Sequence, residues 1–125
     1  MKTILVVDDS RVVRDALRIL FEKEHGLTIC GEAEDGVDAI VKAKELKPDL
    51  ILLDLVMPKL NGAVVASVLK RMVPEVPIIL FTTYEGSLDA LPPIVGVDVI
   101  VSKADGFKNL VRRVRELLYP QKARW

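Results

Sequence analysis

Residues 50–54 read Leu50-Ile51-Leu52-Leu53-Asp54, four consecutive apolar side chains followed directly by a carboxylate. The run is too short for a helix, and it lacks the polar alternation of a strand with one solvated face. It therefore predicts a short strand buried on both faces, as in a parallel sheet. The same pattern stands near the N-terminus, where Ile4-Leu5-Val6-Val7 precedes Asp8 and Asp9.

The rest of the chain alternates short apolar runs with longer amphipathic segments. Three further strands are predicted at 27–33, 77–81 and 97–102. Helices are predicted after the N-cap candidates Ser10, Asp35 and Asp105, before Pro74, and at 87–95, where Pro92-Pro93 interrupts the pattern.

Five strands alternating with about five helices predict an α/β fold. The expected architecture is a flavodoxin-like, doubly wound, five-stranded parallel sheet in the order 2-1-3-4-5, joined by right-handed crossovers. In the second helix we expect Val37, Ile40, Val41 and residues 43–46 to point mostly inward.

Composition narrows the class of protein. The 125 residues suit one domain, which we place at 1–120 with a short tail at 121–125. Lys plus Arg and Asp plus Glu both number 18, and this zero net charge argues against direct nucleic-acid binding through bulk positive charge. Neither a signal peptide nor an apolar stretch of the ~20 residues that span a membrane is evident. Because Cys30 is the single cysteine, we expect a reduced, cytoplasmic protein.

In parallel sheets of this class, ligands bind at the carboxyl ends of the strands, around the switch point between strands 1 and 3. The residues at those ends carry three carboxylates, several hydroxyls and one ammonium group: Asp8, Asp9, Asp54, Thr82, Thr83, Ser102 and Lys103. Polar residues often follow strands simply because strands end in loops, which explains each residue singly but not the combination. Neighbouring carboxylates need compensating positive charge, which Lys103 supplies in part and a hard cation such as Mg²⁺ completes.

This donor set suits phosphoryl transfer, in which a carboxylate acts as nucleophile and forms an acyl phosphate. Asp54 is the best nucleophile candidate because its strand is central and faces Asp8 and Asp9 across the switch point. Thr82 would donate a hydrogen bond to a phosphoryl oxygen, and Lys103 would pair with another. The metal ligands would be Asp8, Asp9, Asp54 and the backbone carbonyl of Val56.

Four motifs follow one another along the chain: Ile4-Leu5-Val6-Val7-Asp8-Asp9, Leu52-Leu53-Asp54-Leu55-Val56-Met57-Pro58 with Asn61-Gly62, Pro77-Ile78-Ile79-Leu80-Phe81-Thr82, and Ser102-Lys103. In order and spacing, and over the whole chain, they resemble the receiver domain of bacterial two-component response regulators, of the chemotaxis-type single-domain kind. The resemblance implies that a sensor histidine kinase or a histidine phosphotransfer protein donates a phosphoryl group to Asp54, with Mg²⁺ bound by Asp8, Asp9, Asp54 and the Val56 carbonyl. It also implies that Thr82 and Lys103 read the phosphate and change the surface that binds a downstream protein.

Such a domain is a phosphoacceptor with slow self-phosphorylation and self-dephosphorylation, not an enzyme that turns over external substrates. The resemblance is compatible with a monomer or with a phosphorylation-dependent homodimer.

The sequence departs from the family pattern at four places. Thr83 stands where the family usually has a small residue, and Ile100 where it often has an aromatic one. Ala104 replaces the proline that commonly follows the lysine on a cis peptide, so a trans bond is the default expectation. Pro92-Pro93 shortens the fourth helix, which belongs to the face that the family commonly uses for output.

Three other functions fit parts of the pattern. An aspartate-nucleophile phosphatase needs a second acid two residues after the nucleophile, where this chain has Val56. A flavin- or nucleotide-binding module needs a glycine- or hydroxyl-rich loop after strand 1, where the charges of Asp8-Asp9-Ser10-Arg11 repel phosphate unless a metal intervenes. The third alternative is the receiver fragment of a longer DNA-binding response regulator, although these residues show no second domain.

Overall fold

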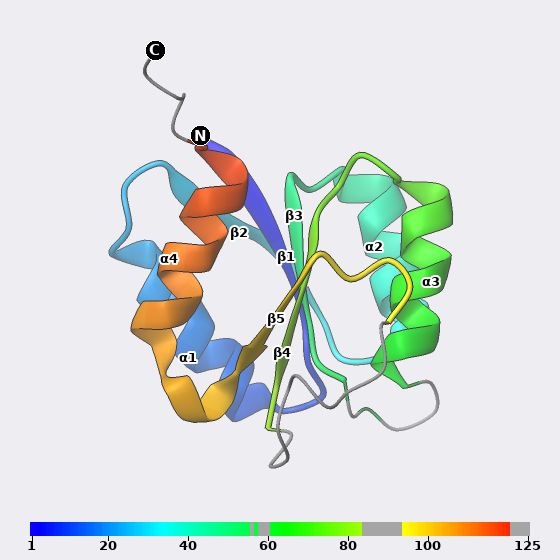
Figure 1. Cartoon of the computed structure of the whole chain (residues 1–125), viewed down its shortest axis with the longest axis horizontal. Coiled ribbons are helices and arrows are strands. Elements are labelled where there is room, and N and C mark those ends of the chain that lie inside the picture. Colours follow the sequence, from blue (N-terminus) through cyan, green and yellow to red (C-terminus); the bar gives the residue numbers. More distant parts are fainter. Residues whose placement is uncertain (56, 58–60, 84–93, 121–125) are drawn as a thin grey trace.

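A five-stranded parallel sheet runs through the computed structural model in the predicted order, β2-β1-β3-β4-β5 (Figure 1). Its strands are β1 (Lys2–Val7), β2 (Leu27–Ala33), β3 (Leu50–Leu53), β4 (Ile78–Thr82) and β5 (Val99–Ser102). The structure describes residues 1–55, 57, 61–83 and 94–120. Within these residues lie four α-helices and one 3-10 turn: α1 (Arg11–Glu22), α2 (Gly36–Leu46), α3 (Gly62–Met72), η2 (Lys103–Asp105) and α4 (Phe107–Leu118). Most of the helix predicted at 87–95, and all of the tail 121–125, fall outside the described residues.

The apolar run at 50–53 forms a strand because helices cover both faces of the sheet. α2 and α3 lie on one face, and α1 and α4 lie on the other (Figure 1). Successive side chains of a strand point to opposite faces. Leu50 and Leu52 accordingly join the core under α1 and α4, and Ile51 and Leu53 join the core under α2 and α3. All four are at most 2% exposed, which explains why the run carries no polar side chain.

Side chains cap three of the four described helices. Ser10 accepts a hydrogen bond from the amide of Val13 at the start of α1. Asp35 accepts one from the amide of Asp38 at the start of α2. Both predicted caps are thus confirmed, and Asn61 caps α3 in the same way.

The predicted cap at Asp105 is wrong. The hydroxyl of Ser102 instead accepts a hydrogen bond from the amide of Ala104, which starts the 3-10 turn η2, and Asp105 belongs to that turn. α4 begins one residue later, after Gly106, whose φ of 82° suits glycine, and no side chain caps it.

α2 packs on the sheet through small residues, and not through the predicted Val37 and Val41. Gly36, Ala39 and Ala43 are buried, whereas Val37 is 61% and Val41 46% exposed. Small side chains let the helix approach the sheet closely. Of the other residues predicted to point inward, Ile40 packs against the core under α2 and α3, whereas residues 44–46 are exposed. None of the described helices is both long and apolar enough to cross a membrane.

Candidate functional site

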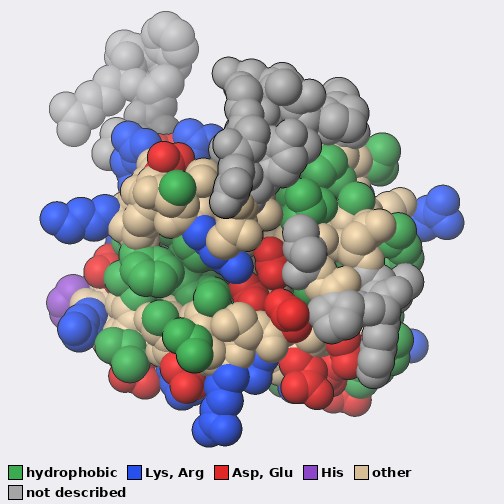
Figure 2. Space-filling model, turned by 90° about the horizontal axis from the view of Figure 1, so that it is seen from below, with side chains coloured by type: hydrophobic (Ala, Val, Ile, Leu, Met, Phe, Trp, Pro, Cys, Tyr) green, Lys and Arg blue, Asp and Glu red, His purple; other side chains and the backbone are tan. Residues whose placement is uncertain are grey.

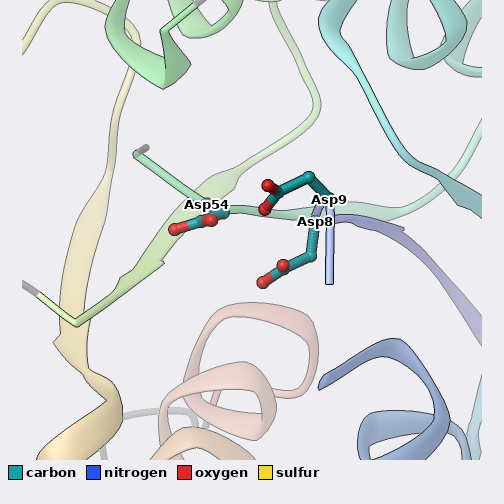
Figure 3. A group of neighbouring side chains, drawn as sticks. All are labelled: Asp8, Asp9 and Asp54. Carbon is teal, nitrogen blue, oxygen red and sulfur yellow. The ribbon is translucent and has the colours of Figure 1, made fainter. Parts of the chain in front are cut away.

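Three carboxylates meet at the carboxyl end of the sheet and form what we call the acidic cluster: Asp8, Asp9 and Asp54. Asp8 and Asp9 follow β1, and Asp54 follows β3, its neighbour in the sheet. Because Val7 and Leu53 are register partners, the residues after them leave the sheet side by side, and the amide of Asp54 donates to the carbonyl of Val7 at 2.9 Å. One oxygen of each carboxylate lies within 4.8 Å of the others, and the three side chains lie together where β1 and β3 end (Figure 3).

Lys103 supplies the positive charge that the sequence predicts beside these acids. Its Nζ lies 2.9 Å from Oδ2 of Asp8 and 3.7 Å from Oδ1 of Asp54. Asp8 is 3% and Asp54 6% exposed, so this attraction acts in a partly desolvated environment, whereas Asp9 is exposed. Acidic side chains gather at the middle of this end of the molecule, next to a basic one (Figure 2).

The acidic cluster fits a magnesium ion. Its donors are hard carboxylate oxygens, and together with one ammonium group the three carboxylates leave an excess of negative charge. The exposure of Asp9 keeps the cluster open to solvent, which suits an ion that retains several of its waters. An acidic triad of this kind is typical of a Mg²⁺ site. Val56 lies outside the described residues, so its carbonyl ligand stays a prediction.

The ends of β4 and β5 bring the remaining predicted residues to the same edge of the sheet. Thr82 is the last residue of β4, is fully buried and is the register partner of Ser102. Thr83 follows it and is exposed. The peptide between Lys103 and Ala104 is trans, as expected for a non-proline bond.

Sequence reasoning missed two aromatic residues near Lys103. The ring centroid of Phe81 lies 5.7 Å from the Nζ of Lys103, a distance at which a cation attracts an aromatic face. The ring of Phe107, at the start of α4, lies 6.1 Å from the ring of Phe81. Because successive side chains of a strand point to opposite faces, the sequence could indicate that Phe81 and Thr82 lie on different faces of the sheet. No local pattern, however, relates Phe81 to Phe107, which is 26 positions further along the chain.

The Asn61-Gly62 motif lies directly against the backbone of Asp54. The amide of Gly62 donates to the carbonyl of Leu55 at 2.7 Å. A Cβ atom on Gly62 would stand 2.3 Å from the carbonyl oxygen of Asp54 and 2.7 Å from the Cα of Leu55. Glycine at this position therefore lets α3 begin in contact with the segment that carries Asp54.

Comparisons of the sequence with known proteins point to one family. The profile of the response regulator receiver domain family matches residues 4–115. Transcriptional regulatory protein YdfI of Bacillus subtilis is 45% identical over 84 residues, which are 67% of this chain and 39% of YdfI. Response regulator protein VraR of Staphylococcus aureus is 31% identical over 114 residues, which are 90% of this chain and 54% of VraR. The chain thus spans about half the length of these relatives, or less.

Solved structures with similar folds are also response regulators. A two-component response regulator of the LuxR family from Aurantimonas sp. SI85-9A1 superposes with a TM-score of 0.88 at 28% identity, covering 99% of this chain and 89% of that chain. Response regulator protein TrrA of Thermotoga maritima, solved in complex with Mg(2+)-BeF, superposes with a TM-score of 0.84 at 34% identity, covering 94% of this chain and 100% of that chain.

Proposed function

This chain belongs to the response regulator receiver domain family, and on that premise we propose that it is a phosphorylation-activated switch of a two-component system with Asp54 as its phosphoacceptor. Receiver domains accept a phosphoryl group from histidine kinases and are not conventional enzymes. The observation that supports Asp54 is the convergence of three carboxylates within 4.8 Å, with Lys103 in contact with two of them. We assign residues 1–120 to this receiver domain.

The proposed reaction transfers a phosphoryl group from a phosphohistidine of a sensor kinase or of a phosphotransfer protein. A carboxylate oxygen of Asp54 attacks phosphorus, and an O–P bond forms as the P–N bond to the imidazole breaks. The imidazole nitrogen keeps the electron pair and later takes up a proton. The products are an acyl phosphate on Asp54 and an unphosphorylated histidine on the donor.

The chain contributes chiefly by positioning groups and by compensating charge. The proposed ligands of Mg²⁺ are Asp8, Asp9, Asp54 and the carbonyl of Val56, and the bound ion would supply positive charge toward the phosphoryl oxygens. The ammonium of Lys103 and the hydroxyl of Thr82 would contact other phosphoryl oxygens. Because Lys103 pairs with Asp8 in this structure, contact with a phosphoryl group changes that pair. Such a change can shift the population between two conformations that differ in the surface offered to a partner.

Mass spectrometry of the intact chain tests the acceptor. After incubation with acetyl phosphate and Mg²⁺, the chain should gain the mass of one phosphoryl group, and Asp54→Asn should abolish the gain because an amide oxygen is a far weaker nucleophile. Asp105→Asn is the matched control, since Asp105 is exposed and lies at the same end of the sheet outside the acidic cluster. Unchanged phosphorylation of Asp54→Asn would refute the assignment.

We expect slow self-phosphorylation and slow loss of the acyl phosphate, with no turnover of external phosphoesters. The acidic cluster supplies a nucleophile and a metal site, and the residue two positions after Asp54 is Val56, which offers no acid to protonate a leaving group. Incubation with p-nitrophenyl phosphate and Mg²⁺ should therefore release no nitrophenol above the rate of Asp54→Asn.

A second candidate function couples the same receiver chemistry to a DNA-binding output in a longer chain. The observation that favours it is that the chain spans 39% of YdfI, a transcriptional regulatory protein, and 54% of VraR. Sequencing the natural transcript beyond codon 125 separates the two candidates, because a DNA-binding domain in the same reading frame supports the longer regulator. In either case, sedimentation with and without beryllofluoride measures whether the activated domain is a monomer or a homodimer.

A further inference from the structure

Arg14 on α1 contacts the backbone that joins two of the three acids. Its Nη1 donates a hydrogen bond to the carbonyl oxygen of Asp8 at 2.7 Å. That oxygen belongs to the peptide group between Asp8 and Asp9, and a peptide group is planar from one Cα to the next. A contact that fixes this carbonyl therefore fixes the directions in which both residues leave the backbone.

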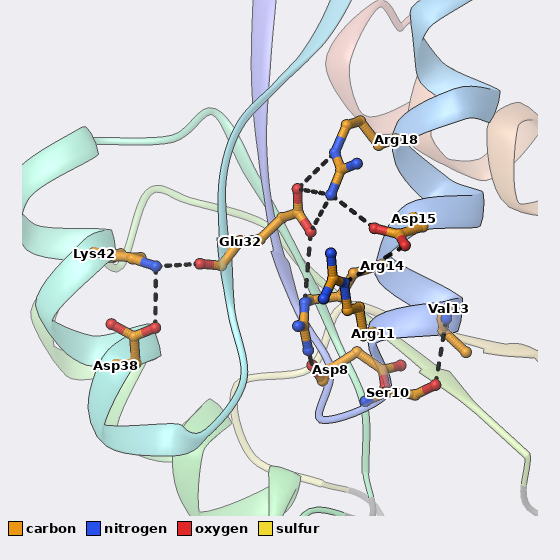
Figure 4. A network of polar contacts seen from close by, with 10 residues as sticks. All are labelled: Asp8, Ser10, Arg11, Val13, Arg14, Asp15, Arg18, Glu32, Asp38 and Lys42. Atoms are coloured by element: carbon orange, nitrogen blue, oxygen red, sulfur yellow. Dashed lines mark hydrogen bonds and ion pairs between the residues drawn. The ribbon is translucent and has the colours of Figure 1, made fainter.

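Arg14 is itself held in place from its other side. Its Nε lies 3.5 Å from Oε1 of Glu32 on β2, and the Arg14 side chain is 14% exposed. Glu32 is fixed in turn, because Arg18 donates to both of its carboxylate oxygens, at 2.9 and 3.0 Å (Figure 4). The ammonium of Lys42 on α2 donates to the carbonyl of Glu32. The guanidinium of Arg14 thus links a rigid anchor on β2 to the peptide after β1.

The two acids depend on this peptide to different degrees. The carboxylate of Asp8 has partners of its own, since Oδ1 accepts from the amide of Ser10 at 2.9 Å and Oδ2 pairs with Lys103. Asp9 is exposed, and its carboxylate makes no hydrogen bond or ion pair within the described part of the chain. No side-chain contact among these residues holds this carboxylate, so where it can reach depends on the backbone that carries it and on its own rotamer.

We propose that Arg14 is a positioning residue for the metal site, which orients the Asp8–Asp9 peptide so that the carboxylate of Asp9 faces Asp8 and Asp54. This inference rests on the proposed function, because it concerns the Mg²⁺ that the acidic cluster would hold. Arg14 would act through the backbone, because its contacts among the described residues are with the carbonyl of Asp8 and with Glu32, and not with a carboxylate of the acidic cluster.

Charge and positioning predict opposite effects of removing Arg14. The guanidinium is a positive charge next to the acidic cluster, so by electrostatics alone its loss would strengthen the binding of a cation. If positioning dominates, the loss of Arg14 weakens Mg²⁺ binding, because the carboxylate of Asp9 no longer faces Asp8 and Asp54. Partners of metal ligands typically contribute about tenfold or more to metal affinity.

Isothermal titration calorimetry with Mg²⁺ alone measures the difference. The variants are Arg14→Gln, Arg14→Lys and Arg18→Gln, each checked by circular dichroism and by thermal unfolding in EDTA. Arg18→Gln is the matched control because Arg18 binds the same carboxylate of Glu32 but has no contact with Asp8. Glu32 also raises the pKa of Arg18, through hydrogen bonding and through its charge.

We expect Arg14→Gln to weaken Mg²⁺ binding roughly tenfold. Arg14→Lys should also weaken it, although it keeps the charge, because an ammonium cannot bridge Glu32 and the Asp8 carbonyl as a guanidinium does. Arg18→Gln should weaken Mg²⁺ binding much less than either Arg14 variant, because Arg14 keeps its own contact with the Asp8 carbonyl when Arg18 is lost. With acetyl phosphate, the Arg14 variants should need more Mg²⁺ for half-maximal phosphorylation and should reach the wild-type rate at saturating Mg²⁺.

Two results would overturn the positioning role and leave the proposed function standing. One is unchanged or tighter Mg²⁺ binding by both Arg14 variants, and the other is an equal loss of affinity in Arg18→Gln. A wild-type chain that does not bind Mg²⁺ would instead contradict the proposed function itself, and the inference with it.

Discussion

Thr83 is exposed and directly follows the buried Thr82, at the edge of the sheet where Asp54 stands. We expect its branched side chain to narrow access to the carboxylate of Asp54. We therefore predict that Thr83→Ala accelerates both the phosphorylation of Asp54 by acetyl phosphate and the later hydrolysis of the acyl phosphate. Both rates can be followed by mass spectrometry of the intact chain.

Thr83→Ser refines this comparison because it keeps the hydroxyl and removes only the methyl group. Rates between those of the wild type and Thr83→Ala would assign the effect to side-chain volume. Equal or slower rates in Thr83→Ala would show that Thr83 does not restrict access.

Gly62 gives a second prediction at the scale of single residues, one in which helix propensity and packing disagree. Propensity alone says that Gly62→Ala stabilises α3, because glycine is the weaker helix former. The missing Cβ, however, would stand 2.3 Å from the carbonyl oxygen of Asp54. We predict that Gly62→Ala destabilises the fold by about 1–3 kcal/mol, the usual cost of overpacking, as measured by urea unfolding. A gain in stability would show that the segment carrying Asp54 moves easily.

At the scale of secondary-structure elements, the N-cap of α3 can be tested in isolation. The side-chain oxygen of Asn61 accepts a hydrogen bond from the amide of Val64 at 3.0 Å. Asn61→Ala removes this acceptor and should cost about 1 kcal/mol in the free energy of unfolding. Asn61→Asp keeps an acceptor at the same place and should unfold at nearly the wild-type urea concentration, so equal losses in both variants would argue against capping.

The elements that could be predicted from the sequence are those fixed by local patterns. Apolar runs such as 50–53 gave the strands, and the capping side chains Ser10 and Asp35 gave the starts of two helices. The start of α4 could not be predicted in this way. Asp105 is a residue type that often caps helices, but here it is the last residue of the 3-10 turn that follows β5. The buried face of α2 was missed because packing against the sheet selects small Ala39 over branched Val37, and no local pattern reports that choice.

The site itself could be predicted only as far as strand ends indicate it. The carboxyl-end rule places Asp8, Asp54 and Lys103 at one edge, and the structure confirms that they meet there. The contact of Arg14 with the Asp8 carbonyl depends on how α1 packs beside β2, so a single sequence carries no signal for it.

At the scale of the whole molecule, we predict that the acidic cluster makes the stability of the fold depend on Mg²⁺. An ion that binds only the folded state stabilises it, by about 2.7 kcal/mol at a hundred times its dissociation constant. Asp9→Asn should abolish this gain. In EDTA the same variant should be slightly more stable than the wild type, by less than about 1 kcal/mol, because it relieves repulsion at an exposed position.

Thermal unfolding with EDTA and with Mg²⁺ measures both effects. Asp105→Asn serves again as the control, since this exposed acid lies outside the cluster and should keep the full response to Mg²⁺. A wild-type response in Asp9→Asn would remove Asp9 from the proposed ligands.

The ion pair between Lys103 and Asp8 joins residues 95 positions apart. As the polypeptide leaves the ribosome, the three acids of the cluster are all present once Asp54 has emerged, yet the ammonium of Lys103 follows 49 residues later. Until the residues that follow β5 have emerged, the acids after β1 and β3 lack the ammonium that pairs with them in the folded chain. Nascent chains stopped before Lys103 should therefore be more easily digested by protease than chains that include α4.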